Sequence, residues 1–181
     1  MASSRAGILE SERLVLRPYT SADAGRYLAM WIENSGHLRE FIPAEVARLR
    51  SRAEMATHIG WLAAEMDASR LFVFGAWTKF GEFVGEAYLA NPSVDLRELE
   101  LGYFLTRTAM GKGFATEAAR RVIDFAFQDL KADRLWAHIA ADNEGSIGVV
   151  VRCGFQLIER RSDGQEKKDG SVVDLLIYQR T

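Results

Sequence analysis

The chain has little cysteine, little histidine and no long apolar run, and each shortage excludes a class of protein. The single cysteine, Cys153, rules out an internal disulfide and any metal site built from several cysteines. The three histidines form neither an HExxH nor an HxH pair, so we do not expect a metal site. The longest apolar run, 71–77, falls far short of the roughly 20 residues of a membrane span. The first residues lack the apolar stretch of a secretory signal. These features favour a reducing, cytoplasmic compartment and no membrane partner.

Neither sign of charge predominates, since 23 Lys and Arg stand against 25 Asp and Glu. A dedicated nucleic-acid binder usually has a strong basic excess, so direct nucleic-acid binding is not expected. Apolar residues make up 48% of the chain, enough to exclude wholesale disorder. With 181 residues, only three prolines and no repeat, the chain is expected to form one domain over 1–181. Within it, we expect 1–11 to be a flexible N-terminus.

Alternating and buried-type patterns predict strands, and apolar stripes three or four residues apart predict helices. The expected strands are 13–17, 71–77, 83–89, 97–106, 135–140, 155–160 and 172–178. The expected helices are 24–32, 55–66, 115–130 and 144–152. Runs of adjacent strands with helices between them predict a mixed sheet in an α/β or α+β domain.

The most informative segment is 100–117, which is expected to run from a strand through a tight loop into the longest helix. Gly111 and Gly113 let the backbone approach a ligand without interference from a Cβ atom. The first turn of a helix leaves N–H groups free, and these favour phosphate or pyrophosphate. Lys112 could add a positive charge there.

Two well-known phosphate-binding loops do not fit this segment. A Rossmann dinucleotide site needs a third glycine where this chain has Thr116, and it normally follows the first strand of the fold. A Walker A loop needs GxxxxGK[ST], which is absent. A bare pair of glycines can also serve only the turn. An anion-binding helix start is therefore favoured, but neither a dehydrogenase nor an NTPase is.

Met110-Gly-Lys-Gly-Phe-Ala-Thr-Glu-Ala118 resembles motif A of the GCN5-related N-acetyltransferase (GNAT) superfamily. The resemblance is closest to the RimJ/RimL branch, which acetylates the N-termini of ribosomal proteins and typically reads WGKGYATEA here. Three further segments are similar to that branch: 12–18, 100–103, and Asn143-Glu-Gly-Ser146 with Gly154-Phe155 after it. Met110 departs from the usual Trp, and Arg152-Cys153 replaces the common Lys-Leu pair. The first departure leaves the backbone donors of the loop in place.

The resemblance implies a GNAT fold. That fold is a mixed, mostly antiparallel twisted sheet of six to seven strands, splayed at the acetyl-CoA site and flanked by about four helices. It implies acetyl-CoA as co-substrate and no metal. The residues that would contact acetyl-CoA are Phe104, Leu105, Thr106, Met110, Gly111, Lys112, Gly113, Phe114, Ala115, Thr116, Asn143 and Ser146. Asn143 is equally well explained as a helix N-cap.

Acetyl transfer to an amine needs a neutral amine and a stabilised leaving thiolate. An α-amine, with a pKa of about 7.7–8.0, needs only a modest base. Glu100 is our candidate base and Ser146 our candidate hydrogen-bond donor to the departing sulfur. Glu98 lies on the same strand face, so Glu98 or an ordered water remains open as the base. We interpret Cys153 as buried packing and His138 as a sheet residue rather than as catalysts.

The function expected from the resemblance is direct transfer from acetyl-CoA to a primary amine, above all the N-terminal α-amine of a ribosomal or other protein. A small-molecule amine, such as a polyamine or an antibiotic, is the alternative acceptor. A non-catalytic acyl-CoA-binding regulatory module is the alternative from another class. The sequence leaves the acceptor open, and whether the chain acts as a monomer or a homodimer.

Overall fold

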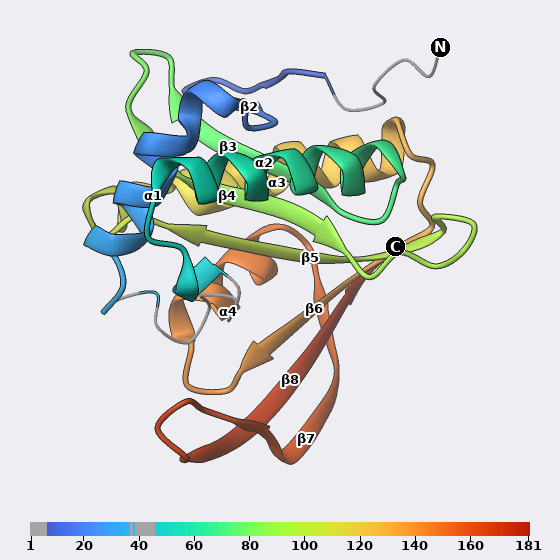
Figure 1. Ribbon diagram of the computed structural model, residues 1–181. Helices are drawn as coiled ribbons and strands as arrows, with labels where there is room; N and C mark the ends of the chain where they lie inside the picture. The colour runs from blue at the N-terminus through green and yellow to red at the C-terminus, as the bar shows by residue number, and fades with distance from the viewer. Residues whose placement is uncertain (1–6, 37, 39–45) are drawn as a thin grey trace.

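The computed structural model describes residues 7–36, 38 and 46–181, and their strands form one eight-stranded sheet. The spatial order of the strands is β1-β2-β3-β4-β5-β6-β8-β7 (Figure 1). The strands are β1 (Leu9–Glu10), β2 (Leu14–Arg17), β3 (Phe72–Thr78), β4 (Phe83–Ala90), β5 (Glu98–Leu105), β6 (Arg134–Ala140), β7 (Gln156–Glu166) and β8 (Val172–Arg180). All neighbouring pairs are antiparallel except β5 and β6.

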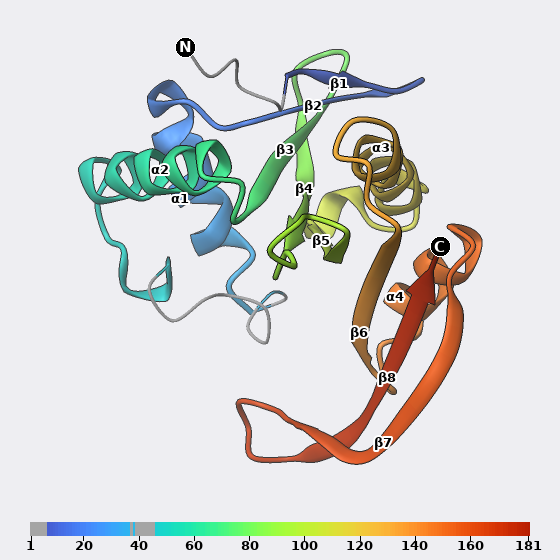
Figure 2. The ribbon, with the colours of Figure 1, turned by 90° about the vertical axis from the view of Figure 1, so that its right-hand side faces the viewer.

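The helices cover both faces of the sheet, and each face has its own hydrophobic core. They are α1 (Ala24–Glu33), α2 (Arg52–Asp67), α3 (Phe114–Gln128) and α4 (Glu144–Arg152), with short 3₁₀ turns at Ser21–Asp23, Val46–Arg48 and Arg107–Ala109. Figure 2 shows α1 and α2 together on one side of β3–β5, with α3 on the other. Because strand residues alternate between faces, the even-numbered residues of β5 face α1 and α2 while Leu99 and Leu101 pack toward α3.

The mixed fold expected from the sequence is confirmed, and every expected strand and helix is present. The sheet has eight strands rather than six or seven because Leu9 and Glu10 pair with β2. Leu9 and Glu10, which lie within the segment 1–11, therefore belong to the sheet. Leu9 is buried in the core, and Arg121 Nε donates to the Glu10 carbonyl oxygen at 3.1 Å. Residues 1–6 lie outside the described residues.

The sheet opens between its two parallel strands. β5 and β6 pair at three positions, the last of which joins Glu100 to Trp136. Beyond that point β5 continues to Leu105 and β6 to Ala140 without pairing with each other, and Figure 1 shows the two strands diverging. Unpaired backbone groups therefore line a wedge, and these are the groups that a ligand with amide bonds can use.

Within the described ranges, no helix is long and apolar enough to span a membrane.

Candidate active site

Three cavities meet at one residue of β5, Tyr103, which lines all of them. The first, which we call the helix-start cavity, has a volume of about 510 Å³ and lies at the start of α3. The second, the crevice, has a volume of about 400 Å³ and lies between β5 and β6. The third, the aromatic cavity, has a volume of about 210 Å³ and lies under α1 and α2. Tyr103 is therefore the residue that the three cavities share.

The start of α3 is built to leave its backbone donors free. Gly111 and Gly113 have φ angles of +75° and +82°, a region in which a side chain is strained. Gly113 is the N-cap residue and makes no side-chain cap to the helix. The first-turn N–H groups and the positive end of the helix dipole therefore face the helix-start cavity, where they can bind phosphate oxygens.

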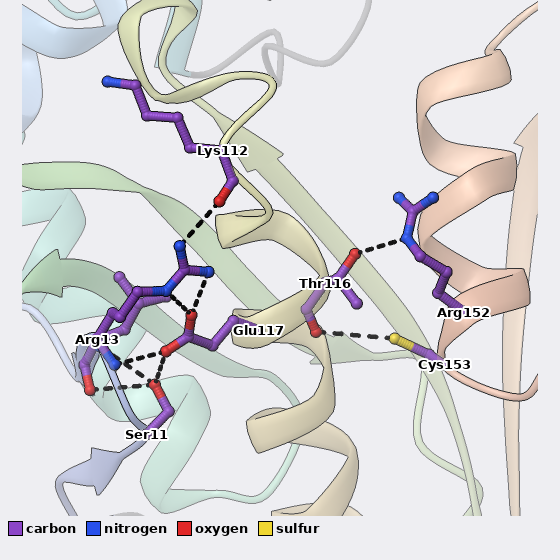
Figure 3. A network of polar contacts seen from close by, with 8 residues as sticks. Ser11, Arg13, Lys112, Thr116, Glu117, Arg152 and Cys153 are labelled. Atoms are coloured by element: carbon purple, nitrogen blue, oxygen red, sulfur yellow. Dashed lines mark hydrogen bonds and ion pairs between the residues drawn. The ribbon is translucent and has the colours of Figure 1, made fainter.

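A clamp from the turn between β1 and β2 holds this loop in place (Figure 3). The Arg13 guanidinium donates to the Lys112 carbonyl oxygen at 3.0 Å and pairs with Glu117 Oε2 at 2.6 Å. The Arg13 backbone N–H and the Ser11 hydroxyl donate to Glu117 Oε1 at 2.7 and 2.8 Å. These hydrogen bonds hold the pKa of the Glu117 carboxyl below its usual value, although partial burial opposes them. Sequence analysis missed the clamp because its members lie about a hundred residues apart.

Arg152, which sequence analysis did not single out as a binding residue, places a positive charge on the wall of the helix-start cavity. Arg152 of α4 lines the helix-start cavity, and its Nε donates to the Thr116 hydroxyl at 3.2 Å (Figure 3). Its guanidinium is therefore positioned to meet a phosphate bound at the start of α3.

Most of the residues expected to contact acetyl-CoA line the helix-start cavity. These are Phe104, Leu105, Met110, Gly111, Gly113, Ala115, Thr116, Asn143 and Ser146. Three others do not line it. Thr106 is buried with its hydroxyl directed to the Val84 carbonyl oxygen, Lys112 is exposed and contributes its carbonyl to the clamp, and Phe114 packs under the Arg13 guanidinium.

Ser146 and Asn143 lie on the wall shared by the helix-start cavity and the crevice. Asn143 is the N-cap of α4, since its Oδ1 accepts from the Ser146 backbone N–H at 3.0 Å. The Tyr103 hydroxyl donates to the Ser146 carbonyl oxygen at 3.0 Å and so ties β5 to α4 across the wedge. The Ser146 hydroxyl makes no hydrogen bond to the described residues, which leaves it available to a ligand.

The crevice places Glu100 beside a histidine. His138 Nδ1 lies 3.0 Å from Glu100 Oε1, and Asn91 Nδ2 donates to Glu100 Oε2 at 2.6 Å. Glu100 and His138 both line the crevice. A histidine held by a carboxylate is the arrangement that orients a general base. His138 is thus in the sheet, as expected, but it also faces the candidate site.

Glu98 is engaged elsewhere. Arg134 donates to its Oε1 at 2.9 Å and Trp136 Nε1 donates to its Oε2 at 3.1 Å. Because Glu100 lines the crevice and Glu98 does not, the geometry favours Glu100 over Glu98 as the carboxylate that serves a ligand.

Cys153 is buried at the end of α4, and burial raises the pKa of its thiol. Its Sγ lies 3.8 Å from the Thr116 carbonyl oxygen (Figure 3). A buried thiol with a raised pKa is a poor nucleophile, which agrees with its interpretation as packing.

Sequence analysis missed a buried carboxyl on β4. Glu86 is 7% exposed, and its Oε2 accepts hydrogen bonds from Tyr19 and Tyr27 at 2.9 and 2.8 Å. Burial raises the pKa of Glu86 to about 7, against the lowering effect of the two tyrosines. The signal was present, since a glutamate stands in the otherwise apolar strand FVGEAYLA. Such a residue usually has a partner or a function.

Tyr88 separates Glu86 from Glu100 on the same face of the sheet. Its ring lies over Gly102, where an added Cβ would come within 2.1 Å of it. Burial, followed by the charges of Glu86 and Glu100, raises the pKa of Tyr88 to about 12.

The site therefore combines an anion-binding helix start, an unpaired wedge with a free hydroxyl, and two carboxylates, Glu86 and Glu100, on the sheet face that α1 and α2 cover. This set suits the transfer of a group from a phosphate-bearing donor to a cationic acceptor.

Comparison with known proteins agrees with this geometry. The sequence model of the acetyltransferase (GNAT) domain matches residues 13–156. The uncharacterized N-acetyltransferase p20 of Bacillus licheniformis is 28% identical over 94% of this chain and 93% of its own length. The putative ribosomal N-acetyltransferase YdaF of Bacillus subtilis is 34% identical over 54% of this chain and 53% of its own.

The fold is also that of a solved structure, the ribosomal L7/L12 α-N-protein acetyltransferase RimL in complex with coenzyme A. The TM-score is 0.86, over 96% of this chain and 97% of that one. At 17% identity the likeness concerns the fold alone.

Proposed function

The chain belongs to the GNAT family of acetyl-CoA-dependent N-acetyltransferases, and on that premise we propose that its acceptor is the N-terminal α-amine of a protein. The observation that carries the proposal is the Glu100–His138 pair, which lines the crevice together with Ser146. A weak base of this kind suits an α-amine, with a pKa of about 7.7–8.0, better than a lysine side chain at about 10.4. The names of RimL and YdaF support a ribosomal protein as the acceptor.

In this account acetyl-CoA lies in the helix-start cavity and supplies the acetyl thioester. The N–H groups of the first turn of α3 hold its pyrophosphate, with Arg152 opposite. The unpaired edge of β5 beyond Glu100 binds its amide-bearing arm, which brings the sulfur toward Tyr103 and Ser146.

The crevice then performs the proton transfers. The Glu100–His138 pair accepts the proton that the acceptor ammonium must lose before its nitrogen attacks the carbonyl carbon. The nitrogen attack forms the carbon–nitrogen bond, the nitrogen loses its second proton, and the carbon–sulfur bond breaks. The departing sulfur accepts a hydrogen bond from the Ser146 hydroxyl and takes up a proton to leave as the free thiol of coenzyme A. Replacing Ser146 by Ala should lower kcat about 10²-fold with a milder effect on acetyl-CoA affinity. We place the reaction in the cytoplasm, which fits the free thiol of Cys153.

The test is thiol release from acetyl-CoA with matched peptides, read together with fragment-ion mass spectrometry. One peptide has a free α-amine and no lysine, and its partner has a blocked N-terminus and one lysine. We expect acetylation of the first peptide only. Thiol release with small primary amines but with neither peptide would contradict the proposal and favour a small-molecule acceptor.

A further inference from the structure

The aromatic cavity ends at a carboxylate with one oxygen left for a ligand. Both tyrosine hydroxyls donate to Glu86 Oε2, and Oε1 makes no hydrogen bond to the described residues. Glu86 lines the cavity although it is only 7% exposed. A buried acid of this kind attracts a positive group, because the pairing offsets part of the free energy lost when the carboxylate left water.

The walls of the cavity suit a cation as well. Its aromatic lining residues are Tyr27, Trp31, His58, Trp61, Tyr88, Tyr103 and Phe104. His58 and Trp61 stack with ring centroids 5.5 Å apart. Aromatic faces attract ammonium groups most strongly where water is excluded. Since only one carboxylate oxygen is available, the site fits the compact charge of an ammonium better than a guanidinium, which favours two parallel hydrogen bonds.

Trp31 completes the aromatic side of the cavity. It is 5% exposed, and its ring centroid lies 4.8 Å from that of Phe104 and 6.0 Å from that of Tyr27. These walls and the Glu86 carboxylate together favour an ammonium group on an apolar stem, as a lysine side chain carries.

The cavity lies at a defined distance from the reacting end of the site. Glu100 faces Ala90 in the register of β4 and β5, so the backbone positions of Glu86 and Glu100 lie four strand residues apart, roughly 13 Å along the strands. Tyr88 lies between them and lines both the crevice and the aromatic cavity. One extended acceptor can thus place one nitrogen in the crevice and a second beside Glu86.

We propose that Glu86 binds a second ammonium group of the acceptor, supplied by a lysine residue close to the N-terminus that is acetylated. This inference rests on the proposed function and names its substrate class. A free linear diamine offers the same ammonium group without a peptide backbone, and the test separates these two sources.

The titration of Glu86 gives the proposal a signature that a structural role would lack. With a pKa of about 7, the carboxyl is largely protonated at pH 6 and largely ionised at pH 8. An ammonium should therefore bind more tightly as the pH rises through 7 and should release a proton when it binds near pH 6. Among the described residues, the other titratable groups that contact Glu86 or line its cavity are Tyr19, Tyr27, Tyr88, Tyr103 and His58. Burial raises the pKa values of the tyrosines, and a His58→Gln variant checks that the pH dependence comes from Glu86.

The experiment compares peptides that begin Ala-Lys and Ala-norleucine, with α-acetylation read by fragment ions. In the wild-type protein we expect kcat/KM to favour Ala-Lys at least tenfold, mainly through KM. Glu86→Gln keeps an oxygen for the two tyrosine hydroxyls and should abolish the preference. Glu82→Gln, at an exposed position in the turn before β4, should retain it. 1,8-Diaminooctane, whose nitrogens lie as many bonds apart as those of Ala-Lys, is compared with 1-aminooctane in the second arm. A larger preference there than with the peptides would identify a free diamine as the source.

Two results would overturn the inference while leaving acetyl transfer itself in place. One is equal rates for Ala-Lys and Ala-norleucine together with no preference for the diamine. The other is a preference for Ala-Lys that survives in Glu86→Gln. If no amine or peptide releases thiol, the proposed function fails instead. Calorimetry of the Ala-Lys peptide and 1,8-diaminooctane at pH 6 and pH 8 then decides the inference. Binding that strengthens with pH in the wild type but not in Glu86→Gln supports it, and pH-independent or absent binding rejects it.

Discussion

At the scale of single residues, the titration of Glu86 should change the free energy of unfolding as well as the binding of an ammonium group. Its pKa is about 7 in the folded protein against 4.5 for a free side chain, so the folded state binds this proton more tightly than the unfolded state. The stabilising contribution is fully present below pH 4.5 and is lost as the pH rises through 7. The free energy of unfolding should fall by about 3 kcal/mol across this window.

Urea unfolding of the wild type and Glu86→Gln between pH 5 and pH 8 measures this effect. In the variant, the free energy of unfolding should fall much less over this pH range. At pH 8 it should equal or exceed that of the wild type. A wild-type stability that does not fall from pH 5 to pH 8 would show that the carboxyl is ionised throughout.

Glu100 and His138 should act as a unit in the chemical step. Glu100→Gln should lower kcat about 10²-fold at pH 7, and the loss should shrink toward pH 9 as the amine loses its proton unaided. His138→Gln should cause a similar loss, and the double variant should lose little more, because either change removes the same pair. The measurement is a pH–rate profile with one α-amine peptide. Glu98→Gln is the matched control. If Glu100→Gln keeps the pH–rate profile of the wild type, then Glu98 or an ordered water is the general base instead.

Cys153 should be dispensable for turnover. Its thiol is buried and its pKa is raised, so it is neither accessible nor ionised enough to take up an acetyl group. Cys153→Ala should keep kcat within about threefold of the wild type and lose stability by about 1 kcal/mol through the vacated volume. A trapped acetyl-cysteine, or a thousandfold loss of kcat in a folded variant, would mean that the transfer is not direct.

At the scale of elements, the turn into α3 depends on backbone that only glycine adopts easily. Gly113 has a φ of +82°, and its Cβ position lies 3.4 Å from Arg13 Nη2. Gly113→Val should strain the turn, misplace the first-turn donors and weaken acetyl-CoA binding at least tenfold. Calorimetry measures the affinity, and Gly81→Val, at a positive-φ turn remote from the site, is the control for strain alone. Unchanged affinity in Gly113→Val would reject this placement of the pyrophosphate.

The elements themselves were predictable because their patterns are local. The stripe that predicts 115–130 reappears as α3, with seven residues buried on one side. β1 was not predicted, because a two-residue strand has no period of its own and forms only by pairing with β2. The divergence of β5 and β6 likewise depends on pairing beyond Glu100, which no local pattern records.

At the scale of the whole molecule, the sequence predicted the donor side of the site better than the acceptor side. The donor side is one contiguous loop with a recognisable motif, whereas the acceptor side is assembled from segments far apart in the chain. Glu86 meets Tyr19 and Tyr27 across more than fifty residues, and His138 meets Glu100 only because β6 lies beside β5. Only the folded chain could show that these groups share one face.

The central claim is that acetyl-CoA and the acceptor reach Tyr103 from opposite sides of the wedge. The most direct test is a crystal structure of the protein with coenzyme A and an Ala-Lys peptide. The account predicts the pyrophosphate within hydrogen-bond distance of the backbone N–H groups at 111–116, the sulfur beside Ser146, and the α-amine in the crevice next to His138. A pyrophosphate away from the start of α3, or an α-amine bound on the same side of the sheet as α3, would contradict it.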